Sequence, residues 1–173
     1  MINRISNDLD MAGWRIHVFD SLSFPTLILR PDRTIVAANL KFFERTGAPE
    51  DQVIGKTCKQ IFFGKGKSKD LPCNGTNCTL DKCVAQKKAQ SIVLKNIDSN
   101  NDQTWEERVF SPILNDDGEV GYVIESLRDI TKVKTLEKKY SDVRQLIDKV
   151  VQSSVSGILA ADRKGEIILM NEA

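Results

Sequence analysis

The sequence has a single histidine, His17, and no recognisable catalytic motif. A lone histidine argues against an ordinary histidine-centred catalytic triad. The attachment motif for covalently held haem, Cys-x-x-Cys-His, is also absent. We therefore expect neither enzyme activity nor a haem group in this segment.

The sequence also lacks an excess of either sign of charge and lacks long apolar runs. Lys and Arg number 25 against 24 Asp and Glu, which gives a net charge of +1 and argues against nucleic acid as a partner. No run of about 18 apolar residues is present, so we expect no membrane span. The first residues lack the apolar segment of a secretory signal. These absences predict a cytoplasmic location.

Cysteine is scarce but concentrated. All four cysteines, Cys58, Cys73, Cys78 and Cys83, lie within residues 58–83. In a reducing compartment, clustered cysteines are more often metal ligands or redox groups than structural disulfides. Four thiolates suit either zinc or an iron–sulfur cluster, because both accept soft sulfur ligands. A disulfide or redox switch, and inert buried thiols, remain as alternatives.

The secondary structure is predicted from periodicity. Over residues 1–22 an apolar residue recurs at helical spacing, at Leu9, Ala12, Ile16 and Phe19. This spacing predicts an amphipathic N-terminal helix. Two strands around a Pro-Asp-Arg turn are predicted within 26–39, helices over 39–47, 48–55 and 78–90, and strands over 91–97, 103–114 and 119–130. Because strands and helices are grouped apart, this order predicts an α+β domain with an antiparallel sheet.

Residues 132–153 have the character of a linker helix. Six apolar residues alternate spacings of three and four, at Val133, Leu136, Tyr140, Val143, Ile147 and Val150. This is the pattern of a coiled-coil seam and predicts a homodimer, to which the N-terminal helix also contributes. The alternative is one amphipathic helix that lies back on its own domain.

The tail repeats an earlier stretch. Within residues 154–173, "GILAADRKGEIILMNEA" resembles "LILRPDRTIVAANLK": a strand, an Asp-Arg turn, a second strand, then Asn. We interpret the tail as the start of a second, truncated domain whose hairpin turn is two residues longer.

These motifs resemble the PAS domain, a bacterial sensor fold, over residues 23–131. The matching stretches are "FPTLILRPDRTIVAAN", "FFERTGAPEDQVIGKT" and "PILNDDGEVGYVIESLRDITKVKTLE". The resemblance implies a five-stranded antiparallel sheet with helices on one face around a small ligand cleft, followed by a signalling helix. It also implies a sensory module without catalysis, connected to a downstream kinase, cyclase or transcription regulator.

The resemblance bears on cofactors as well. Blue-light-sensing PAS domains carry Gly-x-Asn-Cys-Arg-Phe-Leu-Gln where this chain has "GKTCKQIF", with Cys58 at the adduct-forming position. Thr57, Lys59 and Phe62 replace the family's Asn, Arg and Gln, which argues against flavin. Haem-binding PAS domains take a histidine from a helix that corresponds to 78–90, and none is present there.

Together these observations predict a sensory input segment that detects redox state, oxygen or a small ligand through the four cysteines and signals through a dimeric coiled coil. Residues predicted to lie near the ligand cleft are Asn39, Phe42, Phe43 and Trp105. The alternative is a cofactor-free PAS interaction module with structural cysteines.

Overall fold

The computed structural model describes residues 11–62, 78–97 and 102–172. The chain divides into two compact units, which we call unit 1 (residues 1–129) and unit 2 (residues 130–173).

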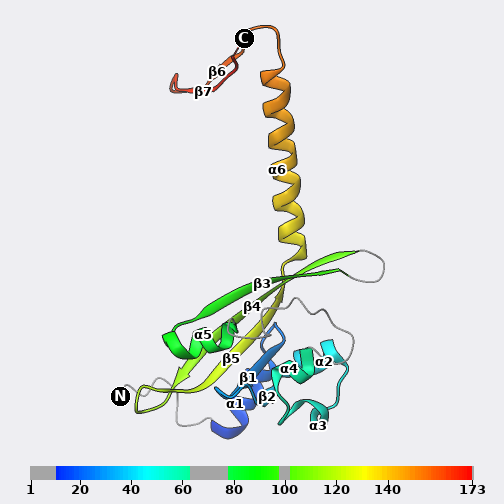
Figure 1. Cartoon of the computed structure of the whole chain (residues 1–173), viewed down its shortest axis with the longest axis vertical. Coiled ribbons are helices and arrows are strands. Elements are labelled where there is room, and N and C mark those ends of the chain that lie inside the picture. The colour runs from blue at the N-terminus through cyan, green and yellow to red at the C-terminus, as the bar shows by residue number, and fades with distance from the viewer. Residues whose placement is uncertain (1–10, 63–77, 98–101, 173) are drawn as a thin grey trace. The chain divides into compact units, whose positions relative to one another are not determined.

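Unit 1 is built on one five-stranded sheet (Figure 1). Its strands are β1 (Thr26–Leu29), β2 (Ile35–Ala38), β3 (Gln90–Ile97), β4 (Gln103–Leu114) and β5 (Val120–Asp129). They lie in the order β2-β1-β5-β4-β3, and every neighbouring pair is antiparallel. The predicted α+β class and antiparallel sheet are confirmed.

Among the described residues of unit 1, five helices accompany the sheet. They are α1 (Met11–Asp20), α2 (Leu40–Thr46), α3 (Glu50–Val53), α4 (Cys58–Phe62) and α5 (Thr79–Gln86). As the sequence predicted, α2 ends at Gly47, whose φ of 63° lies in the left-handed region that favours glycine. Cys78 is the N-cap residue of α5, and Cys83 lies within that helix.

The core lies between α2–α5 and one face of the sheet, which we call the inner face. Alternate residues of a strand point to the same face, and the inner-facing residues of β5, including Val123 and Leu127, are fully or almost fully buried. They pack with Leu27 of β1, Phe42 of α2 and Leu80 of α5 in one cluster. Loss of the Phe42 ring would therefore open a cavity in the centre of this core.

The N-terminal helix differs from its prediction. Of the predicted range 1–22, the structure describes residues 11–22, and Met11–Asp20 of these form helix α1. Leu9 lies outside the described residues. Ile16 is 63% exposed, whereas Phe19 is half-buried. The exposure of Ile16 does not fit the predicted apolar face.

A buried asparagine joins α1, β1 and α2. Asn39 Oδ1 accepts hydrogen bonds from the amides of Thr26 at 2.9 Å and of Phe42 at 3.1 Å. Its Nδ2 donates to the carbonyls of Phe24 at 3.0 Å and of Phe19 at 3.4 Å. Asn39 is therefore both the N-cap of α2 and the link from the end of α1 to the first strand.

Asn39→Ala is expected to lower the free energy of unfolding by about 2–3 kcal/mol, because the buried Thr26 amide loses its acceptor and α2 loses its cap. Urea denaturation measures this change. Thr46→Ala, at the exposed end of the same helix, is the control and should cost less than half as much. Equal losses in the two variants would contradict the assignment.

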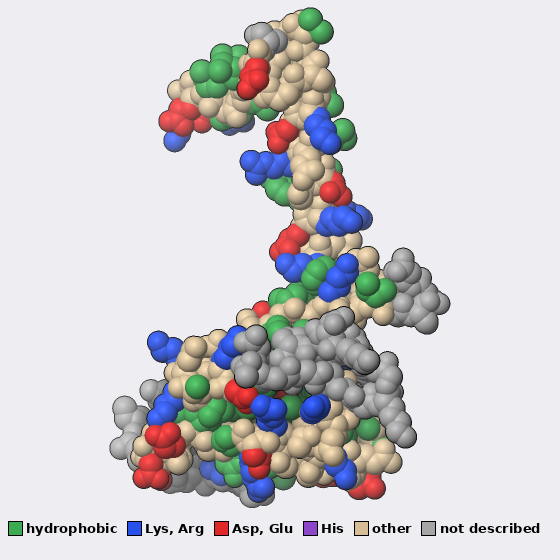
Figure 2. All heavy atoms as spheres, viewed as in Figure 1, with side chains coloured by type: hydrophobic (Ala, Val, Ile, Leu, Met, Phe, Trp, Pro, Cys, Tyr) green, Lys and Arg blue, Asp and Glu red, His purple; other side chains and the backbone are tan. Residues whose placement is uncertain are grey.

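Unit 2 contains one long helix and a hairpin. Helix α6 spans Thr131–Gln152, and the hairpin consists of β6 (Leu159–Ala161) and β7 (Ile167–Met170). The six predicted seam residues of α6 are each at least half exposed in the single chain. Positive and negative side chains are interspersed along the helix (Figure 2). No helix in the described part of the chain is long and apolar enough to cross a membrane.

Candidate functional site

Four charged side chains form a continuous chain of ion pairs from the surface of unit 1 to its core. Arg45 of α2 donates from Nη2 to Glu106 Oε2, and Arg108 Nε donates to Glu106 Oε1 at 2.6 Å. Arg108 Nη1 then reaches Glu125 Oε1 at 3.4 Å. Exposure of the side chains falls from 43% at Arg45 to 1% at Glu125.

The strands explain why these charges are buried. Glu106 and Arg108 alternate in β4 in phase with the buried Phe110, and Glu125 lies in β5 in phase with Val123 and Leu127. All therefore point to the inner face. Burial of charge is costly unless it is paired, and here two carboxylates share one deeply buried guanidinium.

Among the four ion-paired side chains, Glu125 has the least complete set of hydrogen bonds. Its Oε2 is buried and has no hydrogen-bond partner within the described residues. Burial is the main cause that raises the pKa of Glu125 from 4.5 to about 7. Arg108 opposes the rise, and the charges of Glu106 and Cys78 add to it. A carboxyl group that titrates near neutral pH inside a core is a candidate for a sensing group.

Aromatic rings cover the cluster. The guanidinium of Arg108 lies over the Phe62 ring, 3.8 Å from the ring centroid. Phe62 makes an edge contact with Phe42, and Phe42 makes another with Phe43. The predicted cleft residues Phe42 and Phe43 are thus part of the core beside the ion pairs, and Asn39 is a structural clamp.

Two cysteines lie beside this cluster. Cys58, the first residue of α4, and Cys78, the N-cap of α5, are both buried. Burial is the main cause that raises the pKa of Cys58 to about 12, and the charges of Glu125 and Cys78 add to it. Cys58 is therefore a protonated thiol at neutral pH unless a metal ion or another cation replaces its proton.

The other cysteines are placed differently. Cys83 is fully buried and donates from Sγ to the carbonyl of Phe110 at 3.6 Å, and burial raises its pKa. Cys73 lies outside the described residues. Within the described ranges, no three His, Cys, Asp or Glu side chains are placed so that they could hold a metal ion. The four-cysteine site stays a prediction, because its test needs Cys73.

Arg33 holds Cys58 and α5 together. Its carbonyl accepts a hydrogen bond from the amide of Cys58 at 3.1 Å. Its guanidinium binds Asp81, in the first turn of α5, through Nε at 3.2 Å and Nη2 at 2.5 Å. One residue of the β1–β2 turn thus anchors the chain on both sides of residues 63–77.

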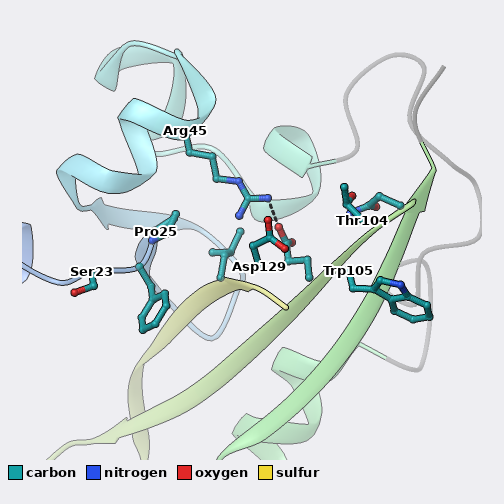
Figure 3. Close-up of a pocket in the computed structure, with 10 residues that line it drawn as sticks. Ser23, Pro25, Arg45, Thr104, Trp105 and Asp129 are labelled. Carbon is teal, nitrogen blue, oxygen red and sulfur yellow. Dashed lines mark hydrogen bonds and ion pairs between the residues drawn. The ribbon is translucent and has the colours of Figure 1, made fainter. Parts of the chain in front are cut away.

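A groove of about 550 Å³ opens at the outer end of the ion-pair chain (Figure 3). Arg45 and Glu106 lie in its wall, close to Asp129, the last residue of β5. Trp105 also lines the groove, and Lys95 Nζ lies 5.6 Å from the centroid of its ring. Trp105 points away from Arg45 in Figure 3, so it is placed at the rim of the groove.

The cluster of Arg45, Arg108, Glu106 and Glu125 was not predicted from the sequence. A signal was present, because the charged residues of β4 and β5 alternate in phase with buried apolar ones. A charge at a predicted inward position is a direct indication of a buried polar site.

Two curated relatives are histidine kinases. A blue-light-activated histidine kinase of Rhizobium johnstonii is 27% identical over 133 residues, which cover 77% of this chain and 37% of that protein. A second protein of that name, from Brucella ovis, is 30% identical over 101 residues, or 58% of this chain and 19% of that protein. The chain thus spans well under half the length of either relative.

Solved structures agree on the fold. An RNA-binding light-oxygen-voltage receptor matches with a TM-score of 0.63 and 20% identity, over 86% of this chain and 40% of that one. The PAS domain of a Colwellia psychrerythraea protein matches with a TM-score of 0.52 and 17% identity, over 71% of this chain and 99% of that one.

The family model for the PAS domain matches residues 23–132, which is well over half of the chain. This range contains the whole five-stranded sheet and the ion-pair chain on its inner face. The protein therefore belongs to the PAS domain family, and its unit 1 is a PAS sensory domain.

Proposed function

We propose that this chain is the sensory input segment of a signal-transduction protein and that the signal is received at the inner face of unit 1, beside Glu125. The observation that carries the proposal is the buried Oε2 of Glu125, which has no hydrogen-bond partner among residues 11–62, 78–97 and 102–172. A core that served stability alone would gain nothing from this atom, because an unsatisfied buried polar group costs about 1–3 kcal/mol. A bound ion, a small ligand or a changed thiol nearby would supply the missing partner.

The cysteines give this site its chemistry. Cys58 and Cys78 are both electrostatically coupled to Glu125: Glu125 helps to raise the pKa of Cys58, and Cys78 helps to raise the pKa of Glu125. A metal centre on Cys58, Cys73, Cys78 and Cys83 would replace neutral thiols with four metal-bound thiolates, a complex of net negative charge, and its oxidation or loss would change the electrostatic field at Glu125. The stimulus we propose is accordingly redox state, oxygen or a small ligand that reaches the centre.

The proposed site is connected to α6 directly through the polypeptide backbone. Glu125 lies on β5, which ends at Asp129, and α6 begins two residues later at Thr131. A shift of β5 is therefore passed to α6 without an intervening loop. We propose that α6 pairs with α6 of a second copy and passes the signal to an output domain, of which the histidine kinases among the relatives are examples.

Flavin is not part of this proposal, although the relatives are named for blue light. The residues around Cys58 depart from the flavin pattern at Thr57, Lys59 and Phe62. The inner face also presents carboxylates at Glu106 and Glu125 where a neutral flavin ring would require amide partners.

A second candidate is a cofactor-free dimerisation module. The observation that favours it is the state of two thiols: Cys58 and Cys83 are both buried with raised pKa values, as expected of inert packed cysteines. In that case the cysteines contribute packing only.

Metal analysis and an absorption spectrum of protein purified without air separate the two candidates. We expect bound iron with a brown colour, or bound zinc in a colourless sample, and loss of the metal in both Cys58→Ser and Cys83→Ser. Val84→Ala, next to Cys83 on α5, is the control and should retain the metal. A metal-free wild-type protein would overturn the four-cysteine centre and leave the dimerisation module.

Dimerisation through α6 is tested by substitution of a residue in its predicted coiled-coil seam. Leu136→Asp is expected to raise the dissociation constant of the dimer at least tenfold, or about 1.4 kcal/mol, because it places a charge in an apolar contact. Gln145→Asp makes the same charge change outside the seam and should leave the constant within twofold. Sedimentation equilibrium measures both. A monomeric wild-type chain would contradict the prediction.

A further inference from the structure

In unit 2, Asn171 repeats the hydrogen-bond pattern of Asn39, which lies 132 residues earlier in the chain. We call this pattern of side-chain hydrogen bonds the asparagine joint. Asn171 Oδ1 accepts a hydrogen bond from the amide of Ile158 at 2.6 Å, as Asn39 Oδ1 does from Thr26. Asn171 Nδ2 donates to the carbonyls of Val151 at 3.1 Å and Ser156 at 3.0 Å. These two carbonyls are the counterparts of the two that accept from Asn39.

The end of α6 corresponds in the same way to the end of α1. The amide of Ser21 donates to the carbonyl of His17 at 2.9 Å, and the amide of Ser153 donates to that of Lys149 at the same distance. The hydroxyl groups of the two serines both donate to the carbonyl three residues earlier. The last turn of α6 therefore takes the place of α1 in unit 2.

The two hairpins also have the same register. Each pair of partners in β6–β7 is 132 residues after a pair in β1–β2, and both hairpins shift register at the same point. The turns match too, because Arg33 and Gly165, 132 residues apart, have positive φ values of 75° and 85°. The predicted two-residue longer turn in the second copy is wrong: Asp32 matches Lys164 and not Asp162.

Two pairs of identical matched side chains differ in how far they are covered. Leu27 and Ile35 are fully buried in unit 1, whereas their counterparts Leu159 and Ile167 are 60% and 61% exposed. Within the described residues, β6 pairs with β7 alone, whereas β1 pairs with both β2 and β5. The surface that is exposed on β6–β7 is thus the surface that β5, α2 and α5 cover in unit 1.

We propose that residues 149–172 are the first part of a second domain with the fold of unit 1, and that their exposed apolar surface and the unpaired edge of β6 bind a segment of the longer polypeptide equivalent to residues 41–129. Helix α6 then has two roles: it leaves the first domain and enters the second. Asn171 is the positioning residue that fixes its end to β6. This inference goes beyond the proposed function, since it needs neither a metal centre nor a stimulus.

The joint is tested in the chain as it exists, by amide hydrogen exchange. Ile158 is expected to be protected in the wild type and to lose at least tenfold of that protection in Asn171→Ala. Asn171→Asp keeps the acceptor oxygen and should retain most of it. Thr26, held by Asn39, should not change in either variant. An Ile158 amide that exchanges as fast as unstructured peptide in the wild type would overturn the proposal.

Binding to the exposed surface of β6–β7 is tested by adding a segment equivalent to residues 41–129. Residues 41–129 of this chain are fused directly after Glu172, which occupies the position of Leu40 in the repeat. We expect the Ile158 amide to gain at least a hundredfold in protection and to approach that of Thr26 in the same molecule. The same fusion with Gly165 deleted, which breaks the register of the turn, is the control and should show no gain.

A fused segment that exchanges as unfolded chain while unit 1 stays protected would overturn the second domain. The metal content and the dimer constant measured for the proposed function do not enter this result, so each proposal can fail alone.

Discussion

Arg108→Met is expected to lower the free energy of unfolding by about 3–5 kcal/mol at pH 8, because it leaves the carboxylates of Glu106 and Glu125 buried without their shared cation. Methionine retains much of the apolar volume over the Phe62 ring. The measured effect therefore reports mainly the loss of charge. Chemical denaturation with urea gives the free energy.

Arg128→Met is the matched control for this prediction. Arg128 lies on the neighbouring strand, is 46% exposed, and approaches Glu107 only to 4.0 Å. Exposed pairs of this kind contribute about 0–1 kcal/mol. If the two variants lose similar amounts, the buried ion-pair chain does not have the role in the core that we assign to it.

The stability of the protein is expected to fall by about 3 kcal/mol, relative to Glu125→Gln, as the pH rises from 4.5 to 7. The folded-state pKa of Glu125 is raised, so its proton is held more tightly in the folded chain than in the unfolded one. The stabilisation is complete below pH 4.5, where both states are protonated. It is lost as the pH rises through 7, and no further change follows above that.

The pH series must isolate the titration of Glu125 from that of the groups around it. Arg108 and Glu106 both act on the pKa of Glu125, and Cys58 remains a thiol over the whole range. Denaturation midpoints at several pH values, with a chelator present, are compared between wild type and Glu125→Gln. Parallel curves for the two proteins would show that Glu125 does not titrate in this range. The expected result would make the proposed site responsive to pH near neutrality.

The sequence was a good guide to the elements of the fold. The bounds predicted for β4 match the observed strand, Gln103–Leu114, because runs of polar residues in the sequence flank it on both sides. Helix α5 was recognised from its composition, and Cys78 was expected at its start. These features are local, and local chemistry determines them.

The candidate site could be predicted only in part. Arg45 and Glu106 are 61 residues apart, and Arg33 and Asp81 are 48 apart, so no spacing rule connects either pair. The even spacing of Cys73, Cys78 and Cys83 gave no indication that Cys83 would bond to the carbonyl of Phe110. Which groups meet across the inner face depends on the packing of α2, α4 and α5 against the sheet.

The two bonds that Arg33 makes, to the Cys58 amide and to Asp81, have a consequence for how such a domain can diversify. They fix the two points between which residues 63–77 are inserted, independently of what the insert contains. Closure of a flexible loop costs only about 0.6 kcal/mol more for each doubling of its length. Segments of different length and ligand chemistry can therefore be exchanged between these two points without a change in the sheet, which makes this position suitable for engineering the domain.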